Sequence, residues 1–198
     1  MMRIVLPTDF SENAFNAIAY AAKLVKDTTC IFYLLHAYTP PIYRVDYTLG
    51  SPGQLGLPDD HRYSAEVALE KTKKRIKAKF DNPRHEFVTH AAFNTLEDEI
   101  KTMVIKENID LIIMGTQGAT GAREILFGSN TVHVLKKAIV PVLAVPSNFD
   151  FTPPKRIVFP TDYEVDYAHT DLDFLLHLSK LWGAKLHVMH VSTPDGLT

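Results

Sequence analysis

The chain has a single cysteine, no excess of basic charge and no long apolar run, and each absence excludes a class of protein. One cysteine in 198 residues, Cys30, cannot form an intrachain disulfide, which is typical of a reducing compartment. With 21 Lys and Arg against 23 Asp and Glu, no general basic field exists to attract nucleic acid. No apolar run approaches the roughly 18 residues that span a membrane, and the opening strand-like residues 1–7 are too short for a signal peptide. We therefore expect a cytoplasmic protein without nucleic-acid or membrane partners.

Patterns for catalysis and for metal binding are missing as well. The nine histidines form no His-Glu-x2-His pattern and no spacing typical of metal ligands. No nucleophile and base pair, and no dedicated pair of acids, stands out. Cys30 lies in an apolar segment and is expected to be an inert core thiol. The sequence predicts no catalytic residue and no metal site, and it indicates binding chemistry.

An internal repeat organises the chain. Residues 3–10 (Arg-Ile-Val-Leu-Pro-Thr-Asp-Phe) recur as residues 156–163, with only a Leu-to-Phe and a Phe-to-Tyr exchange. A looser likeness continues from residues 34–37 to residues 188–191. A repeat of this kind indicates two copies of one structural unit.

The second copy stops part-way. We expect a complete domain over residues 1–147, a linker over 148–154, and an incomplete second copy over 155–198 that consists of a strand, a helix and a strand. The chain is then either a truncated tandem protein or a one-domain protein with a fragmentary tail.

Strand-like runs, such as the one that contains the apolar residues 4–6, alternate with amphipathic segments along the first copy. Such runs are typical of strands in a parallel sheet buried on both faces, and apolar residues at steps of three and four are typical of helices. Strands are expected over residues 3–6, 30–37, 86–93, 111–114 and 140–145, helices over 13–26, 61–80, 95–107 and 131–138, and a long loop over 39–60. The predicted fold class is α/β, a Rossmann-like five-stranded parallel sheet with helices on both faces, plus a partial second β-α-β copy.

The strongest local signal is a glycine-rich segment after the fourth expected strand. Gly115 stands at the carboxyl end of that strand, where open α/β sheets bind ligands. Gly118 lets the backbone approach a ligand closely. Gly128 and Ser129 then open a helix, whose first amides lack internal partners and favour anions. The segment predicts a phosphate-binding pocket, although its spacing fits neither a Walker A loop nor the dinucleotide fingerprint.

These residues also have purely structural interpretations. Gly115 could end its strand in a plain turn, and Ser129 or Asn130 could be a routine N-cap. Asp9 could be the N-cap of the first helix, with Glu12 three residues later completing a capping box. Capping by Asp9 is compatible with a contact between its carboxylate and a ligand.

The glycine spacing resembles the nucleotide-binding motif of universal stress proteins of the ATP-binding type. The motif reads Gly115-x2-Gly118-x9-Gly128-Ser129 in this chain. The resemblance covers the whole first copy and the surviving part of the second. It implies a five-stranded parallel sheet and dimerisation through the last strand, in a family where tandem pairs are common. The other segments that look like this family are residues 4–11, 35–37, 110–115 and 140–146.

The resemblance implies a role for each position that matches the motif. Gln117 departs from the family pattern, which commonly has a basic residue or histidine there. The resemblance implies that Pro7, Thr8 and Asp9 lie beneath the nucleoside, with the Asp9 carboxylate near the ribose or base. It implies that the backbone of Ala37 meets the adenine edge and that Met114 lies beside the sugar. The phosphates would be surrounded by Gly115 and Gly118 and bound by the amides, and one hydroxyl, of Gly128, Ser129, Asn130 and Thr131.

The resemblance therefore implies a stress-response or signalling module that binds ATP or another adenine nucleotide, with or without Mg²⁺. It also implies a homodimer formed through residues 140–145. One alternative is a dimeric interaction module of the same fold that binds no nucleotide, and the other is a slow ATP hydrolase. The glycines favour nucleotide binding, and because no water-activating base is evident we expect at most weak ATPase activity. Asp162 in the second copy has no glycine-rich loop to serve, so that half-site is expected to stay empty.

Overall fold

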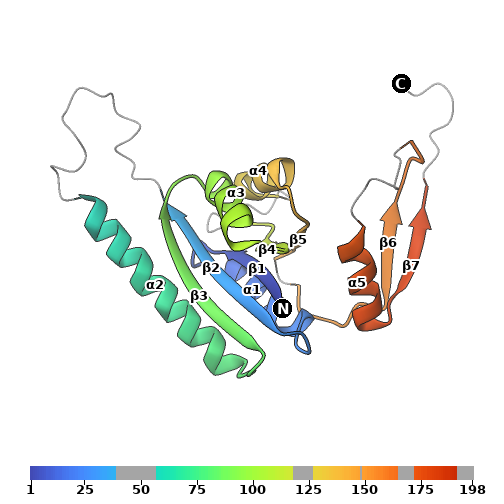
Figure 1. The fold of residues 1–198 in the computed structure, drawn as a ribbon, viewed down its shortest axis with the longest axis horizontal. Helices are drawn as coiled ribbons and strands as arrows, with labels where there is room; N and C mark the ends of the chain where they lie inside the picture. Colours follow the sequence, from blue (N-terminus) through green and yellow to red (C-terminus); the bar gives the residue numbers. More distant parts are fainter. Residues whose placement is uncertain (39–56, 118–126, 148, 165–171, 191–198) are drawn as a thin grey trace. The chain divides into compact units, whose positions relative to one another are not determined.

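The computed structural model describes residues 1–38, 57–117, 127–147, 149–164 and 172–190, with the side chains of 57–60 left out (Figure 1). The chain divides into two compact units, Met1–Phe151 and Thr152–Thr198. In the described part of the chain, no helix is both long and apolar enough to cross a membrane.

The first unit is built on a five-stranded parallel sheet. Its strands lie in the order β3-β2-β1-β4-β5, and all neighbouring pairs run parallel. This arrangement confirms the predicted fold class. The strands are β1 (Met2–Pro7), β2 (Cys30–Tyr38), β3 (His85–Phe93), β4 (Leu111–Gly115) and β5 (Val142–Val145).

Two helices cover each face of this sheet. The chain steps from β1 to β2 to β3 in one direction, and from β3 to β4 to β5 in the other. Because such crossovers are right-handed, the first two helices lie on one face and the last two on the opposite face. The helices are α1 (Glu12–Leu24), α2 (Leu57–Lys79), α3 (Leu96–Glu107) and α4 (Ser129–Lys137).

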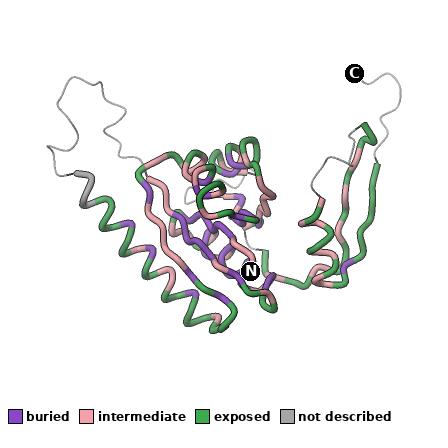
Figure 2. The backbone as a smooth tube through the Cα atoms, viewed as in Figure 1, coloured by how far each residue is buried: buried purple, intermediate pink, exposed green. Residues whose placement is uncertain are grey.

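The hydrophobic core lies between the central strands and the helices that cover both faces of the sheet. The central strands are buried along nearly their whole length, as the purple segments of Figure 2 show. One cluster joins Val5 and Leu35 of the sheet to Ile100 of α3 and Val134 of α4. Burial on both faces explains why β1 and β4 read as continuous apolar runs rather than as alternating ones.

Several expected boundaries are shifted, most of them by one or two residues. The loop expected over residues 39–60 ends earlier, because α2 begins at Leu57. Pro58 falls in the first turn of α2, where the missing amide costs no helical hydrogen bond. The rest of that expected loop lies outside the described residues. The last strand, expected from residue 140, begins at Val142.

The second unit is a strand, a helix and a strand. It contains β6 (Arg156–Pro160), α5 (Asp173–Trp182) and β7 (Lys185–Met189), and the two strands pair in parallel. Helix α5 ends at Gly183, whose φ of +60° is the left-handed conformation that favours glycine at a helix end. This is the element order expected for the second copy.

Candidate functional site

The candidate site lies at the carboxyl ends of β1 and β4. These strands are neighbours, yet the chain leaves β1 toward β2 and leaves β4 toward β5, in opposite directions. Open α/β sheets bind ligands at such a reversal point. The turn that follows β1 and the carboxyl end of β4 therefore lie at the place where a ligand is expected.

Two hydrogen bonds attach the start of α4 to the end of β4, and a third attaches the end of β4 to β5. The Gly128 amide donates to the Thr116 carbonyl at 2.7 Å, and the Thr116 amide donates to the Val145 carbonyl at 2.9 Å. The Thr131 hydroxyl donates to the Gly115 carbonyl at 3.0 Å. Thr116, which the sequence did not single out, thus connects β4, β5 and α4. The first turn of α4 is held at the strand ends.

The N-terminus of α4 differs from those of α1 and α3. Its N-cap is Gly128, which supplies no side-chain hydrogen bond, and its first turn holds no acidic residue. The interpretation of Ser129 or Asn130 as an N-cap is therefore wrong. By contrast, Ser11 caps α1 and Thr95 caps α3, and both of those helices carry acidic residues in their first turns. The positive end of the α4 dipole has no charge from its own first turn to offset it.

Thr131 is oriented toward the protein. Its residue is 2% exposed, and its hydroxyl hydrogen points to the carbonyl of Gly115, with the Thr116 carbonyl 3.5 Å away. The expected hydroxyl contact with a phosphate would have to compete with this bond. Ser129 and Asn130, on the same turn, are exposed.

Gly115 lies where two backbones approach closely. A Cβ at this position would be 3.3 Å from the backbone oxygen of Asn13, near the start of α1. That separation is tighter than ordinary van der Waals contact, so a side chain here would push α1 and β4 apart. The close approach accounts for glycine at the end of β4.

The turn after β1 is held by its own side chains. The buried Thr8 donates its amide to the Leu35 carbonyl at 2.8 Å, and its hydroxyl oxygen accepts from the Phe10 amide at 3.0 Å. Phe10 has a φ of +66°, which bulky residues rarely adopt. Asp9, between them, is exposed at the rim of the sheet, whereas Pro7 is buried.

The alternative interpretation of Asp9 and Glu12 as a capping box is wrong. The N-cap of α1 is Ser11, whose hydroxyl oxygen accepts from the Ala14 amide at 3.2 Å. Asp9 Oδ1 accepts from the Ser11 amide at 3.1 Å and from its hydroxyl at 2.6 Å, so Asp9 holds the cap rather than forming it. Glu12 instead pairs with both terminal nitrogens of Arg75, and this hydrogen bonding lowers the pKa of Glu12.

A histidine that the sequence did not single out packs against this turn. His36 Nδ1 lies 2.8 Å from the carbonyl oxygen of Thr8, and its ring centroid is 4.4 Å from that of Phe10. The neighbouring Ala37 is half-buried and pairs in register with Ala92 of β3. Met114 is buried in the core cluster on the α3 and α4 face. The sequence signals for His36 are its recurrence in the repeat and its place in residues 35–37, which look like the family.

Gln117 and Gly118 follow directly after Thr116 at the end of β4. Gly118 lies outside the described residues, so its contact with phosphate stays a prediction. Gln117 Oε1 accepts a hydrogen bond from the Ser147 hydroxyl at 3.1 Å, which ties the segment after β4 to the segment after β5. Among the described residues, no group of three or more His, Cys, Asp or Glu is arranged to hold a metal ion.

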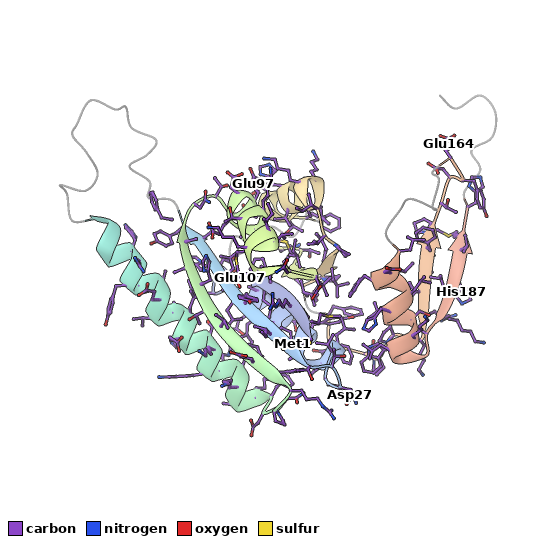
Figure 3. All side chains as sticks on the ribbon, in the orientation of Figure 1. Met1, Asp27, Glu97, Glu107, Glu164 and His187 are labelled. Carbon is purple, nitrogen blue, oxygen red and sulfur yellow. The ribbon has the colours of Figure 1, made fainter. Side chains whose placement is uncertain are left out.

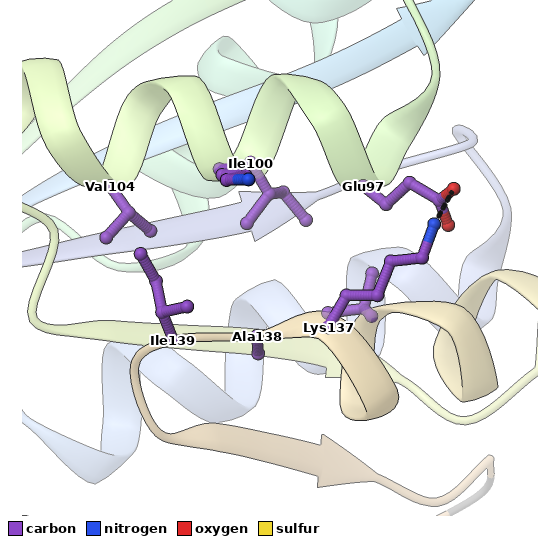
Figure 4. A pocket seen from close by; sticks show the side chains of 8 residues that line it. Glu97, Ile100, Val104, Lys137, Ala138 and Ile139 are labelled. Atoms are coloured by element: carbon purple, nitrogen blue, oxygen red, sulfur yellow. Dashed lines mark hydrogen bonds and ion pairs between the residues drawn. The ribbon is translucent and has the colours of Figure 1, made fainter.

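Other polar clusters of the first unit serve packing. Glu107, labelled in Figure 3, accepts a hydrogen bond from the Tyr33 hydroxyl at 3.0 Å and, through its carbonyl, one from Arg3 at 2.6 Å. Burial, together with this carboxylate, raises the pKa of Tyr33. A shallow pocket between α3 and α4 is bridged by Lys137 and Glu97 at 2.7 Å (Figure 4). None of the predicted site residues lines that pocket.

These features define a doubly wound α/β protein with its candidate ligand site at the strand carboxyl ends. Residues 1–146 match the model of the universal stress protein family, and the chain belongs to that family. Universal stress protein MJ0531 of Methanocaldococcus jannaschii is 33% identical over 149 residues, which cover 72% of this chain and 81% of that protein.

Solved structures agree with this assignment. The crystal structure of a universal stress protein from Archaeoglobus fulgidus is 25% identical with a TM-score of 0.68, and the match covers 98% of this chain and 68% of that longer chain. A universal stress protein solved in complex with cAMP is 18% identical with a TM-score of 0.52, covering 74% of this chain and 98% of that one. At 18% identity, the match to the protein solved with cAMP shows a similar fold.

Proposed function

We propose that this chain is a cytoplasmic stress-response or signalling module that binds ATP or another adenine nucleotide at the carboxyl ends of β1, β2 and β4. The phosphates lie at the first turn of α4, and the nucleoside lies over the turn after β1. Mg²⁺ accompanies the phosphates where the nucleotide carries it. No residue is assigned to catalysis, so hydrolysis is at most a weak side activity.

The observation that carries this proposal is the N-terminus of α4. It lacks a side-chain cap and an acidic first turn, and its bonds to Thr116 and Gly115 hold it beside the strand ends. Backbone amides without helical partners and the positive end of the dipole together favour a phosphate group. A helix end arranged only for stability would be expected to carry the cap and the acidic residues that α1 and α3 carry.

The nucleoside end rests on different residues. Asp9 is exposed in the turn that follows β1, the strand that pairs with β4, and its carboxylate can accept hydrogen bonds from ribose hydroxyls. Ala37, near the end of β2, has a small side chain, and we place its backbone at the edge of the base. A protein of this fold has been solved with cAMP, so the fold accommodates an adenine nucleotide.

We further propose that the domain over residues 1–147 self-associates through residues 140–145. Strand β5 forms one edge of the five-stranded sheet, and its residues Val142, Leu143 and Ala144 are only half-buried within one chain. Apolar edge strands are usually covered or paired in the native assembly. An interaction module that binds no nucleotide would form the same dimer. Self-association therefore does not distinguish that function from nucleotide binding.

We also propose that residues 155–198 are the beginning of a second domain of the same family, joined by a linker over 148–154. Its strand, helix and strand follow the order of β1, α1 and β2. The match to the longer Archaeoglobus fulgidus protein extends over 98% of this chain, well beyond the first unit.

Calorimetric titration with ATP, ADP, AMP and cAMP, with and without Mg²⁺, tests nucleotide binding directly. Replacement Gly115→Val should weaken the affinity at least tenfold, about 1.4 kcal/mol, because its Cβ would lie 3.3 Å from the Asn13 oxygen and push α1 and the end of β4 apart. Gly183→Asn is the matched control, since Gly183 has open space around it in the second unit. Asparagine tolerates its positive φ.

Two results would contradict the proposal. One is a folded wild-type protein that binds none of these nucleotides. The other is an affinity that stays the same in Gly115→Val, which would place any nucleotide site elsewhere. A change in Gly183→Asn equal to that in Gly115→Val would show that the loss reflects general destabilisation.

A further inference from the structure

The turn that presents Asp9 is clamped by a side chain from the neighbouring strand. Thr8, at the start of the turn, has its carbonyl oxygen 2.8 Å from His36 Nδ1, and the His36 ring packs on Phe10 at a centroid distance of 4.4 Å. Phe10 is the residue with the unfavourable positive φ. The imidazole therefore contacts both the beginning of the turn and its strained residue.

The chemistry of this contact fixes the tautomer. A carbonyl oxygen can only accept a hydrogen bond, so Nδ1 of His36 must carry the hydrogen. The Thr8 amide is also used, since it donates to the Leu35 carbonyl of β2. Thr8 is thus bound to β2 through both of its backbone groups, which fixes where the turn leaves the sheet.

The second unit contains the same clamp. Its Tyr163 has a φ of +63° and donates its amide to the Thr161 hydroxyl at 3.0 Å. His190 Nδ1 lies 2.8 Å from the Thr161 carbonyl oxygen, and its ring centroid is 4.9 Å from that of Tyr163. The Glu164 amide donates to Asp162 Oδ1 at 3.0 Å, as the Ser11 amide does to Asp9.

The surroundings of the two clamps differ. Val5 of β1 is fully buried, whereas Val158, its counterpart in β6, is 55% exposed. The turn therefore keeps its form without the same core around it. Its geometry is set by the threonine, the aspartate, the aromatic residue and the histidine.

We propose that His36 is a positioning residue that holds the Asp9 turn in the form that receives the nucleoside. This inference rests on the proposed nucleotide site. The Asp9 carboxylate is tied to Ser11, two residues further along the same turn, so a shift of the turn moves the carboxylate with it. Without the clamp, Phe10 relaxes from its positive φ and Asp9 leaves its place at the rim.

Three variants separate the hydrogen bond from the ring. His36→Phe keeps an aromatic ring against Phe10 and removes the donor. His36→Asn keeps an N–H donor at the position equivalent to Nδ1. We expect His36→Phe to weaken the affinity for ATP about three- to tenfold, the effect of one lost hydrogen bond, and His36→Asn to stay within about twofold of wild type. His190→Phe removes the same bond in the second unit and should leave the affinity unchanged.

A spectroscopic measurement accompanies the titrations. In ¹⁵N-labelled protein above the titration range of histidine, both His36 and His190 should be in the Nδ1–H tautomer. An Nε2–H tautomer at His36 would overturn the proposal whatever the variants do, which covers the case in which His36→Phe does not fold.

The outcomes distinguish this inference from the proposed function. If wild type binds no adenine nucleotide, the proposed function fails and the clamp has no nucleotide to serve. If wild type binds and His36→Phe binds equally well, only the positioning role fails. Equal losses in His36→Phe and His36→Asn would assign the effect to the imidazole ring and overturn the hydrogen-bond role.

Discussion

Removing the Thr131 hydroxyl tests whether the start of α4 is held where phosphate binding needs it. Thr131→Val keeps the shape of the side chain and deletes the donor that reaches the Gly115 carbonyl at 3.0 Å. The site is almost fully buried, so water cannot replace the lost bond. Thr131→Ser keeps the hydroxyl and is the matched control.

The expected cost follows from the burial. Leaving a buried polar group without its partner destabilises a protein by about 1 to 3 kcal/mol. For a unit of this size, the melting temperature falls by about 3 °C for each kcal/mol. The affinity for nucleotide should fall as well, because the first-turn amides of α4 would be less firmly placed at the strand ends.

The assay must report on the first unit. The single tryptophan, Trp182, lies in α5 of the second unit, so its fluorescence follows the wrong part of the chain. Thermal melting by far-UV circular dichroism, with amide hydrogen exchange of α4, measures the first unit. If Thr131→Val melts and binds nucleotide as wild type does, the bond between Thr131 and Gly115 does not hold the helix, and the reasoning is refuted.

Three further predictions concern other parts of the first unit. Burial raises the pKa of the Cys30 thiol to about 11, so the native protein should resist iodoacetamide at pH 8 while the unfolded chain reacts; rapid alkylation of native protein would contradict this. Burial also lowers the pKa of His85, so folding stability should decline as the pH falls below about 6.5, where the unfolded chain gains a proton that the buried ring resists. A variant His85→Gln should show a weaker decline in chemical denaturation between pH 7 and pH 5. Light scattering should give the mass of two chains at micromolar concentration, and Leu143→Lys in β5 should shift it toward one chain; a wild-type mass of one chain would reject the dimer.

The fold could be predicted from the sequence because the alternation of strand-like and helical patterns continues along the first copy. Strands β1 and β4 read as apolar runs, since both faces of the sheet are covered there, and α1 has an apolar stripe. The start of α2 was misplaced because Pro58 looks like a loop residue, although proline is also well tolerated in a first helical turn. Local composition does not distinguish these two uses of proline.

The sequence names candidate site residues but does not predict how their side chains are oriented. Asp9 and Ser11 are both good N-caps, and only the turn at Phe10 decides that Ser11 takes the role. Thr131 matches the expected position, yet its hydroxyl points to Gly115 because the strand end lies beneath it. His36 was missed because its partner, Thr8, is 28 residues away in the chain, and such a contact has no local pattern.

The position of Thr116 between β5 and α4 gives the molecule a route for thermodynamic linkage. Its amide donates to Val145 on the edge strand, and its carbonyl accepts from Gly128 at the start of α4. The proposed dimer strand and the proposed phosphate site therefore share one residue's backbone. If pairing of β5 with a second chain changes nucleotide affinity by some factor, nucleotide must change the dimerisation constant by the same factor. In such a domain the fraction of dimer would depend on the fraction of chains with bound nucleotide, without any catalytic step.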